Sequence, residues 1–121
     1  MSTNELLDTL YESTKVGKLE WVSGITSDMF YLNFDNKTSL VIQKELNISQ
    51  MGWDIVIYIY SPSKELIKSF RINDAPNHLT PVSEEFLKGA ELMGMINGYI
   101  NKKDSAILND IVNQIRNKIA I

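Results

Sequence analysis

The chain has 121 residues and a net charge of −3 at pH 7, with an ordinary globular composition of 44% hydrophobic and 22% charged residues. This length favours a single domain over residues 1–121. The lack of cysteine excludes disulfides, thiolate catalysis and cysteine-ligated metal sites. The negative charge disfavours a nucleic acid partner, because neither residues 1–80 nor residues 81–121 carry an excess of positive charge.

The N-terminal segment begins with polar and acidic residues, unlike a secretory signal with its basic and apolar regions. The longest purely apolar run has six residues, whereas a membrane span needs about 20. We therefore expect a cytoplasmic protein that does not enter a membrane. Frequent isoleucine and asparagine, with little alanine or arginine, are typical of an AT-rich bacterial or phage genome.

The first predicted element is a helix that starts at Ser2 and ends before Gly17. Ser2 and Glu5 have the spacing of a capping box, in which each side chain bonds the other residue's free backbone amide. Apolar residues then recur at helical spacing. Gly17 suits the end of the helix because it adopts the left-handed conformation at low cost.

Residues 19–72 change to an alternating pattern that predicts five strands. The second and third strands are separated by a short turn at residues 35–37, which contains Asp35 and Asn36. Residues 61–64, with Pro62 in second place, predict a turn between the fourth and fifth strands. Short connections throughout favour an antiparallel meander.

Two helices are predicted after an irregular segment at residues 73–80. The first begins with Pro81 and runs to about residue 100, and residues 101–103 are expected to turn the chain. Asp104 or Ser105 then caps a third helix with a clear apolar stripe. The stripe consists of Ile107, Leu108, Ile111, Val112, Ile115 and Ile119. The predicted fold class is α+β: an N-terminal helix, a five-stranded antiparallel meander sheet and two C-terminal helices packed on one sheet face.

A short segment near the N-terminus carries a family resemblance. It contains Leu10, Thr14, Gly17, Lys18, Leu19 and Trp21. With the strand meander and the C-terminal helices that follow, it resembles a set of small uncharacterised bacterial proteins found on mobile elements and in accessory genomes. That set has no assigned activity, so the resemblance implies no functional residue.

Catalytic and metal-binding patterns are weak. His78 is the only histidine and would be the centre of any histidine-dependent site with Asp74, but no nucleophile motif accompanies it. Glu84 and Glu85 are adjacent on a predicted helix, so their side chains diverge and better suit the positive end of the helix dipole. No calcium loop, zinc motif or phosphate loop is present in the sequence. We therefore expect no catalytic residue, no metal and no cofactor.

One face of the predicted sheet carries the first candidate binding surface, formed by Tyr31, Tyr58, Tyr60 and Arg71. Tyrosine and arginine are favoured at binding surfaces, where tyrosine supplies a large area and a hydroxyl group. The alternative is a solvated face with ordinary cross-strand pairs. The choice depends on which face the helices cover, and both faces contain apolar residues.

The second candidate is a row of small residues, Ala90, Gly94 and Gly98, spaced four apart on the second predicted helix. Glycine weakens a helix interior by about 1 kcal/mol relative to alanine, so two glycines on one face suggest a close approach of another backbone. We expect the approaching backbone to be internal, from the third helix or the sheet. A subunit interface is the alternative.

Together these observations predict a non-enzymatic cytoplasmic binding protein that uses the tyrosine-bearing face, with a protein partner or self-association as a homodimer. An inhibitor, immunity protein or anti-defence factor of a mobile element fits the composition and the resemblance. Its acidity would suit a basic partner. The alternative is a small-molecule-binding protein or minor enzyme with a pocket between sheet and helices, lined by Trp21, Trp53 and methionines.

Overall fold

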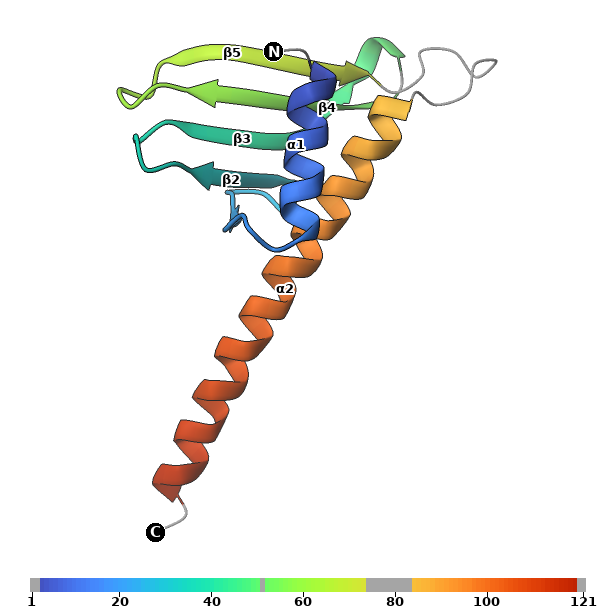
Figure 1. The fold of residues 1–121 in the computed structure, drawn as a ribbon. Coiled ribbons are helices and arrows are strands. Elements are labelled where there is room, and N and C mark those ends of the chain that lie inside the picture. Colours follow the sequence, from blue (N-terminus) through green and yellow to red (C-terminus); the bar gives the residue numbers. More distant parts are fainter. Residues whose placement is uncertain (1–2, 51, 74–83, 120–121) are drawn as a thin grey trace.

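The computed structural model describes residues 3–50, 52–73 and 84–119 (Figure 1). Two helices, five strands and one short 3-10 turn make up the described chain. In chain order they are α1 (Thr3–Lys15), β1 (Val22–Ser23), β2 (Met29–Asn33), β3 (Ser39–Asn47), η1 (Ile48–Gln50), β4 (Gly52–Tyr60), β5 (Leu66–Asn73) and α2 (Glu84–Ile119).

Helix α1 has the amphipathic character that its sequence predicts. Leu6, Leu7 and Leu10 are buried on one side. The helix ends at Lys15, and Gly17 follows with a φ of 75° in the left-handed region, where its amide donates to the Thr14 carbonyl over 3.0 Å. The predicted partner in the capping box, Ser2, lies outside the described residues.

The sheet is a five-stranded antiparallel meander with the order β1-β2-β3-β4-β5, as predicted. Both predicted hairpin turns are present, and each contains one lysine in the left-handed region: Lys37 with a φ of 66° and Lys64 with a φ of 67°. Asn36 stabilises the first turn because its side-chain oxygen accepts the Thr38 amide over 3.1 Å. The predicted first strand is shorter than expected, since only Val22–Ser23 pairs with β2.

The two helices cover the sheet face that carries Phe30, Ile42, Ile57 and Phe70, which lie side by side across β2 to β5. These four side chains form one buried cluster with residues of both helices. The strand period of two therefore places Tyr31, Val41 and Tyr58 on the opposite, outer face. This packing shows which sheet face the helices cover, a choice that the sequence left open.

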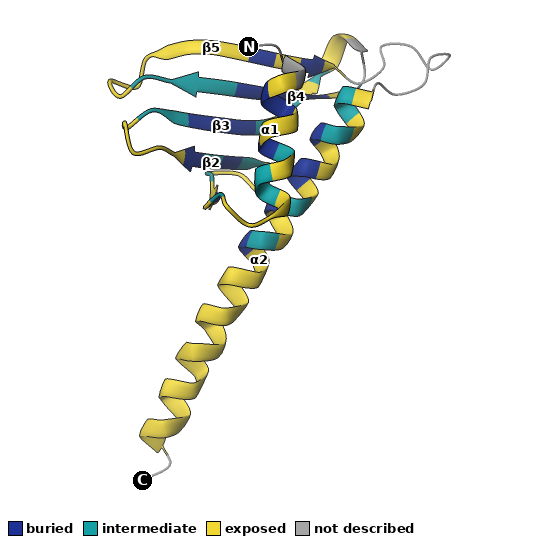
Figure 2. Cartoon of the chain, in the orientation of Figure 1, coloured by how far each residue is buried: buried dark blue, intermediate teal, exposed yellow. Residues whose placement is uncertain are grey.

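The core lies between the sheet and the helices, where the buried residues of Figure 2 concentrate. Trp21, just before β1, is only 1% exposed, and its indole nitrogen donates to Thr14 Oγ1 over 3.0 Å. Leu92 and Ile96 of α2 are fully buried and belong to this core between the sheet and the helices. The two helices also contact each other, and Lys88 of α2 pairs with Asp8 of α1.

The expectation of two C-terminal helices is wrong, because residues 84–119 form one continuous helix. Asn101, Lys102 and Lys103 were predicted to turn the chain, but none is a glycine or proline and none has a positive φ. Asparagine, lysine and aspartate all tolerate a helix interior, so nothing interrupts the backbone hydrogen bonds there. At 1.5 Å per residue, the 36-residue helix is about 54 Å long.

Only the first half of α2 packs on the sheet, and the second half extends away from it (Figure 1). We call residues 84–100 the packed half and residues 101–119 the projecting half. Every residue of the projecting half is exposed, as Figure 2 shows. The predicted third helix therefore exists as helical structure but does not cover the sheet.

Candidate functional site

A polar cluster occupies one end of the outer sheet face. We call Glu45, Asp54, Tyr58 and Arg71 the outer polar cluster; these residues come from the adjacent strands β3, β4 and β5. The Arg71 guanidinium bridges the two carboxylates, with Nη1 2.7 Å from Asp54 and Nη2 3.1 Å from Glu45. Because these strands are neighbours, one arginine links side chains of three strands.

Glu45 collects further hydrogen bonds. Tyr58 donates its hydroxyl hydrogen to this carboxylate, and Gln43 donates to it over 2.6 Å. Burial acts to raise the pKa of Glu45, but the hydrogen bonds from Tyr58, Gln43 and Arg71 outweigh it and hold that pKa below its usual value. The bond to Glu45, together with burial, raises the pKa of Tyr58 to about 12. The phenol is therefore protonated at neutral pH.

Asp54 is a buried carboxylate on the outer face, with 1% of its side chain exposed. Besides Arg71, its partners include the Asn47 side-chain amide, which donates over 3.1 Å. A buried charge is tolerated only when it is paired and hydrogen-bonded, and this one is both. Arg71 and the Tyr58 hydroxyl are thus held by carboxylates of their own chain, which gives both groups a structural role.

A second part of the outer face forms a shallow depression of about 500 Å³, which we call the outer hollow. Tyr31 and Tyr60 line it, and the Tyr60 ring lies 6.4 Å from the ring of Tyr58. The full lining comprises Met29, Tyr31, Asn33, Ser39, Val41, Gln43, Tyr60 and Lys64. The structure therefore brings the three predicted tyrosines onto one face but divides them, with Arg71, between the hollow and the outer polar cluster.

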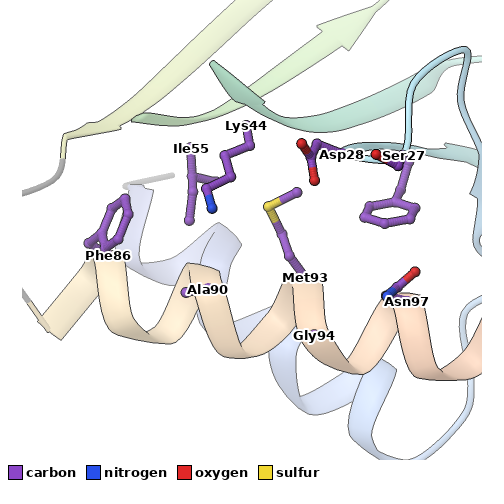
Figure 3. Close-up of a pocket in the computed structure, with 10 residues that line it drawn as sticks. Ser27, Asp28, Lys44, Ile55, Phe86, Ala90, Met93, Gly94 and Asn97 are labelled. Carbon is purple, nitrogen blue, oxygen red and sulfur yellow. The ribbon is translucent and has the colours of Figure 1, made fainter. Parts of the chain in front are cut away.

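A smaller cavity of about 230 Å³ lies between the sheet and α2 (Figure 3). Met93 extends from the helix toward the sheet, and Lys44 extends from β3 toward the helix. Neither Trp21 nor Trp53 lines this cavity, although both were expected beside such a pocket. Its volume is below the roughly 300 Å³ at which small-molecule sites usually begin.

The row of small residues on α2 does not make the internal contact expected of it. Ala90, Gly94 and Gly98 are exposed, and a Cβ added to either glycine would meet nothing within 4 Å. Gly89 is the glycine that faces the sheet, where an added Cβ would lie 3.0 Å from Ile55 Cδ1. The helix thus turns Gly89 inward, while Ala90 and Gly94 lie at the rim of the cavity in Figure 3.

The projecting half of α2 carries an apolar stripe that the sequence predicts but assigns to the core. Its members are 42% to 78% exposed. They are Ile107, Leu108, Ile111, Val112, Ile115 and Ile119. Large exposed apolar patches mark interaction sites in soluble proteins. The signal for this surface was visible in the sequence as helical periodicity, but periodicity does not say which partner covers the stripe.

The described residues contain no group of three or more histidine, cysteine, aspartate or glutamate side chains that could hold a metal ion. His78 and Asp74 lie outside the described residues. Glu84 and Glu85 lie in the first turn of the described part of α2. This position agrees with the prediction that they interact with the positive end of the helix dipole. No helix in the described ranges is long and apolar enough to cross a membrane.

No protein-family model, curated protein or solved structure matches this chain. Any function must therefore be inferred from the surfaces of the molecule itself.

Proposed function

We propose that the protein is a non-enzymatic binding protein whose main binding element is the projecting half of α2. The observation that carries this proposal is the stripe of six large aliphatic side chains, each at least 42% exposed, on one side of that segment. Burying such side chains is the dominant favourable term in protein association. A helix that presents i, i+3 and i+4 apolar residues is a familiar way to bind a protein groove or another helix.

The local sequence supports a need for a partner. Most helix stability in proteins comes from packing an apolar face rather than from intrinsic propensity. The projecting half contains Asn109, Asn113 and Asn117 as well as several β-branched residues, all of which have modest helix propensity. Its helix therefore has little intrinsic stability, and burial of the stripe against a partner would supply the missing free energy.

Site-specific photo-crosslinking in living cells tests this function. A photoreactive residue placed at Ile111 lies in the stripe, whereas the same residue at Asn113 lies nearly opposite on the helix. We expect a discrete protein adduct from position 111 and little or none from position 113. Equal labelling from both positions, or none from position 111, would contradict the proposal.

The outer hollow supports a second candidate, a small-molecule-binding role. Its volume of about 500 Å³ lies within the ordinary range for ligand sites, and Tyr31 and Tyr60 supply aromatic area beside Lys64. A bound metabolite would raise the melting temperature in proportion to RT ln(1 + [L]/Kd). A metabolite screen that gives such shifts in the native protein, and loses them in Tyr60→Ala, would favour this alternative.

The biological process remains a separate part of the proposal. An inhibitor, immunity or anti-defence factor acts by occupying a surface of another protein, which a projecting apolar helix is suited to do. The identity of the adduct formed at position 111 tests that role directly. An adduct with a nuclease or another defence component would support it, and an adduct with the protein itself would instead indicate assembly.

A further inference from the structure

One row of residues along the projecting half begins and ends with a charged residue. Asp104, Leu108, Ile111, Ile115 and Lys118 follow one another in steps of four, three, four and three residues, which places them in one row along the helix. All five are exposed. The apolar centre of the row is therefore bounded by an acid toward the domain and a base toward the C-terminal end.

The two charged residues of this row lie at equal distances in sequence from its centre and have opposite charges. Ile111 stands seven residues from both Asp104 and Lys118. A second copy laid antiparallel about Ile111 would bring Asp104 of each helix beside Lys118 of the other. A parallel copy would instead bring Asp104 against Asp104 and Lys118 against Lys118. Opposite charges at the ends of a helix pair favour one orientation over the other, so the row complements itself only when antiparallel.

We propose that the projecting half of α2 pairs in antiparallel orientation with the projecting half of a second copy of this chain. This inference names the partner for the proposed function and rests on it. The stripes of the two copies cover one another, with Ile111 near the two-fold axis. Such a symmetric interface uses the same patch on both copies, which is the usual arrangement in homodimers.

The base of the projecting half offers room for the far end of the second helix. A hollow of about 320 Å³ there is lined by Trp21, Val22, Ser23, Ile100, Lys103 and Asp104. In the antiparallel pair, Ile119 of one copy reaches the level of residues 103 and 104 of the other, beside this hollow. Ile119 is 78% exposed, the highest fraction in the stripe, and this placement would cover it.

The oligomeric state of the full chain is the first test. Sedimentation velocity over a wide concentration range should show a reversible dimer. Ile111→Asp places a charge at the centre of the interface and should raise the dimer dissociation constant roughly a hundredfold. Asn113→Asp adds the same charge on the opposite side of the helix and should leave the dissociation constant nearly unchanged. Urea denaturation at low protein concentration, where the monomer prevails, reports whether the domain remains folded in both variants.

Charge reversal tests the orientation. Asp104→Lys or Lys118→Asp alone should weaken the dimer roughly tenfold at low salt, because each creates like-charge contacts twice per dimer. The double variant Asp104→Lys with Lys118→Asp should restore the affinity. A parallel dimer would not show this rescue, because identical residues would already face each other in every variant.

Engineered cysteines give an independent test, since the natural chain has none. An equal mixture of Ile107→Cys and Ile115→Cys proteins should form mainly mixed disulfides under mild oxidation. Mainly like-with-like disulfides would overturn the antiparallel arrangement. A protein that stays monomeric, or whose dimer ignores Ile111→Asp, overturns the self-pairing. If position 111 nevertheless crosslinks to a different protein in cells, the proposed binding function stands and only the identity of its partner fails.

Discussion

The two halves of α2 contain the same kind of apolar series, but only the packed half buries it. In the packed half, Leu92 and Ile96 are fully buried and Ile100 is 7% exposed. In the projecting half, Ile107 and Ile111 are 52% and 47% exposed. The helix itself does not change between these residues. What changes is the surface opposite, because the sheet lies against the first half and ends before the second.

The glycines of α2 extend this comparison to the backbone. Gly89 faces Ile55 and Ile72 of the sheet at close range, so the absence of a side chain has a packing reason. Gly94 and Gly98 face open space among the described residues, and no internal contact explains them. A helical pattern therefore shows that a face is to be covered, but it does not identify the covering surface.

Hydrogen exchange should separate the two halves most strongly. In dilute solution, where any dimer has dissociated, the amides of residues 108–114 should exchange with little protection. The amides around Leu92 and Ile96 should exchange roughly a thousandfold more slowly or more, because they open only when the packed core unfolds. Protection of residues 108–114 that rises with protein concentration would show that self-association covers this segment. Strong protection in the dilute monomer would contradict the difference between the two halves.

Truncating isoleucine in each half should give the next largest difference. Ile96→Ala removes a fully buried side chain and should lower the free energy of unfolding by about 3 kcal/mol. Ile111→Ala, the matched change in the projecting half, should alter the monomer's stability by less than about 0.5 kcal/mol. Urea denaturation at low protein concentration measures both values, and similar losses would show that the projecting half packs within its own chain.

Alanine substitution of the glycines should give effects that differ between the two positions. Gly94→Ala should stabilise the protein by about 1 kcal/mol, because alanine favours helix and its Cβ meets nothing. Gly89→Ala should gain less or lose stability, since the Ile55 side chain must move to admit the new Cβ. Thermal denaturation distinguishes these outcomes. A destabilising Gly94→Ala would point to an unseen close contact at that position.

The smallest effect we predict is a pH dependence confined to the sheet. Because the folded-state pKa of Glu45 lies below its ordinary value of 4.5, its carboxylate stabilises the fold above pH 4.5. That contribution is lost as the pH falls below 4.5 through the folded-state pKa. Glu45→Gln should therefore reduce the loss of stability in acid, measured by urea denaturation from pH 6 to pH 3. Glu65→Gln, at an exposed position, is the control, and an equal effect there would contradict the role of Glu45.

The candidate site was only partly predictable. Residue alternation correctly grouped Tyr31, Tyr58 and Tyr60 on one face, because side chains in a strand alternate between faces. It could not show that Tyr58 and Arg71 bond the carboxylates of Glu45 and Asp54, since that contact depends on the register of three strands. Nor could it show that Gly89, rather than Gly94, faces the sheet, because the rotation of α2 is set by packing.

Short-range sequence signals account for the local structure of most of this chain. The capping of α1 by Gly17, the turns at Asn36 and Pro62 and the alternation of the strands all depend on neighbouring residues, and these fix the meander. Two features depend on long-range packing instead: which sheet face the helices cover, and where along α2 that cover ends. Asn101, Lys102 and Lys103 can continue a helix or leave one. The chain continues as a helix past the sheet, so the apolar stripe that local periodicity predicted has no covering surface within the described chain.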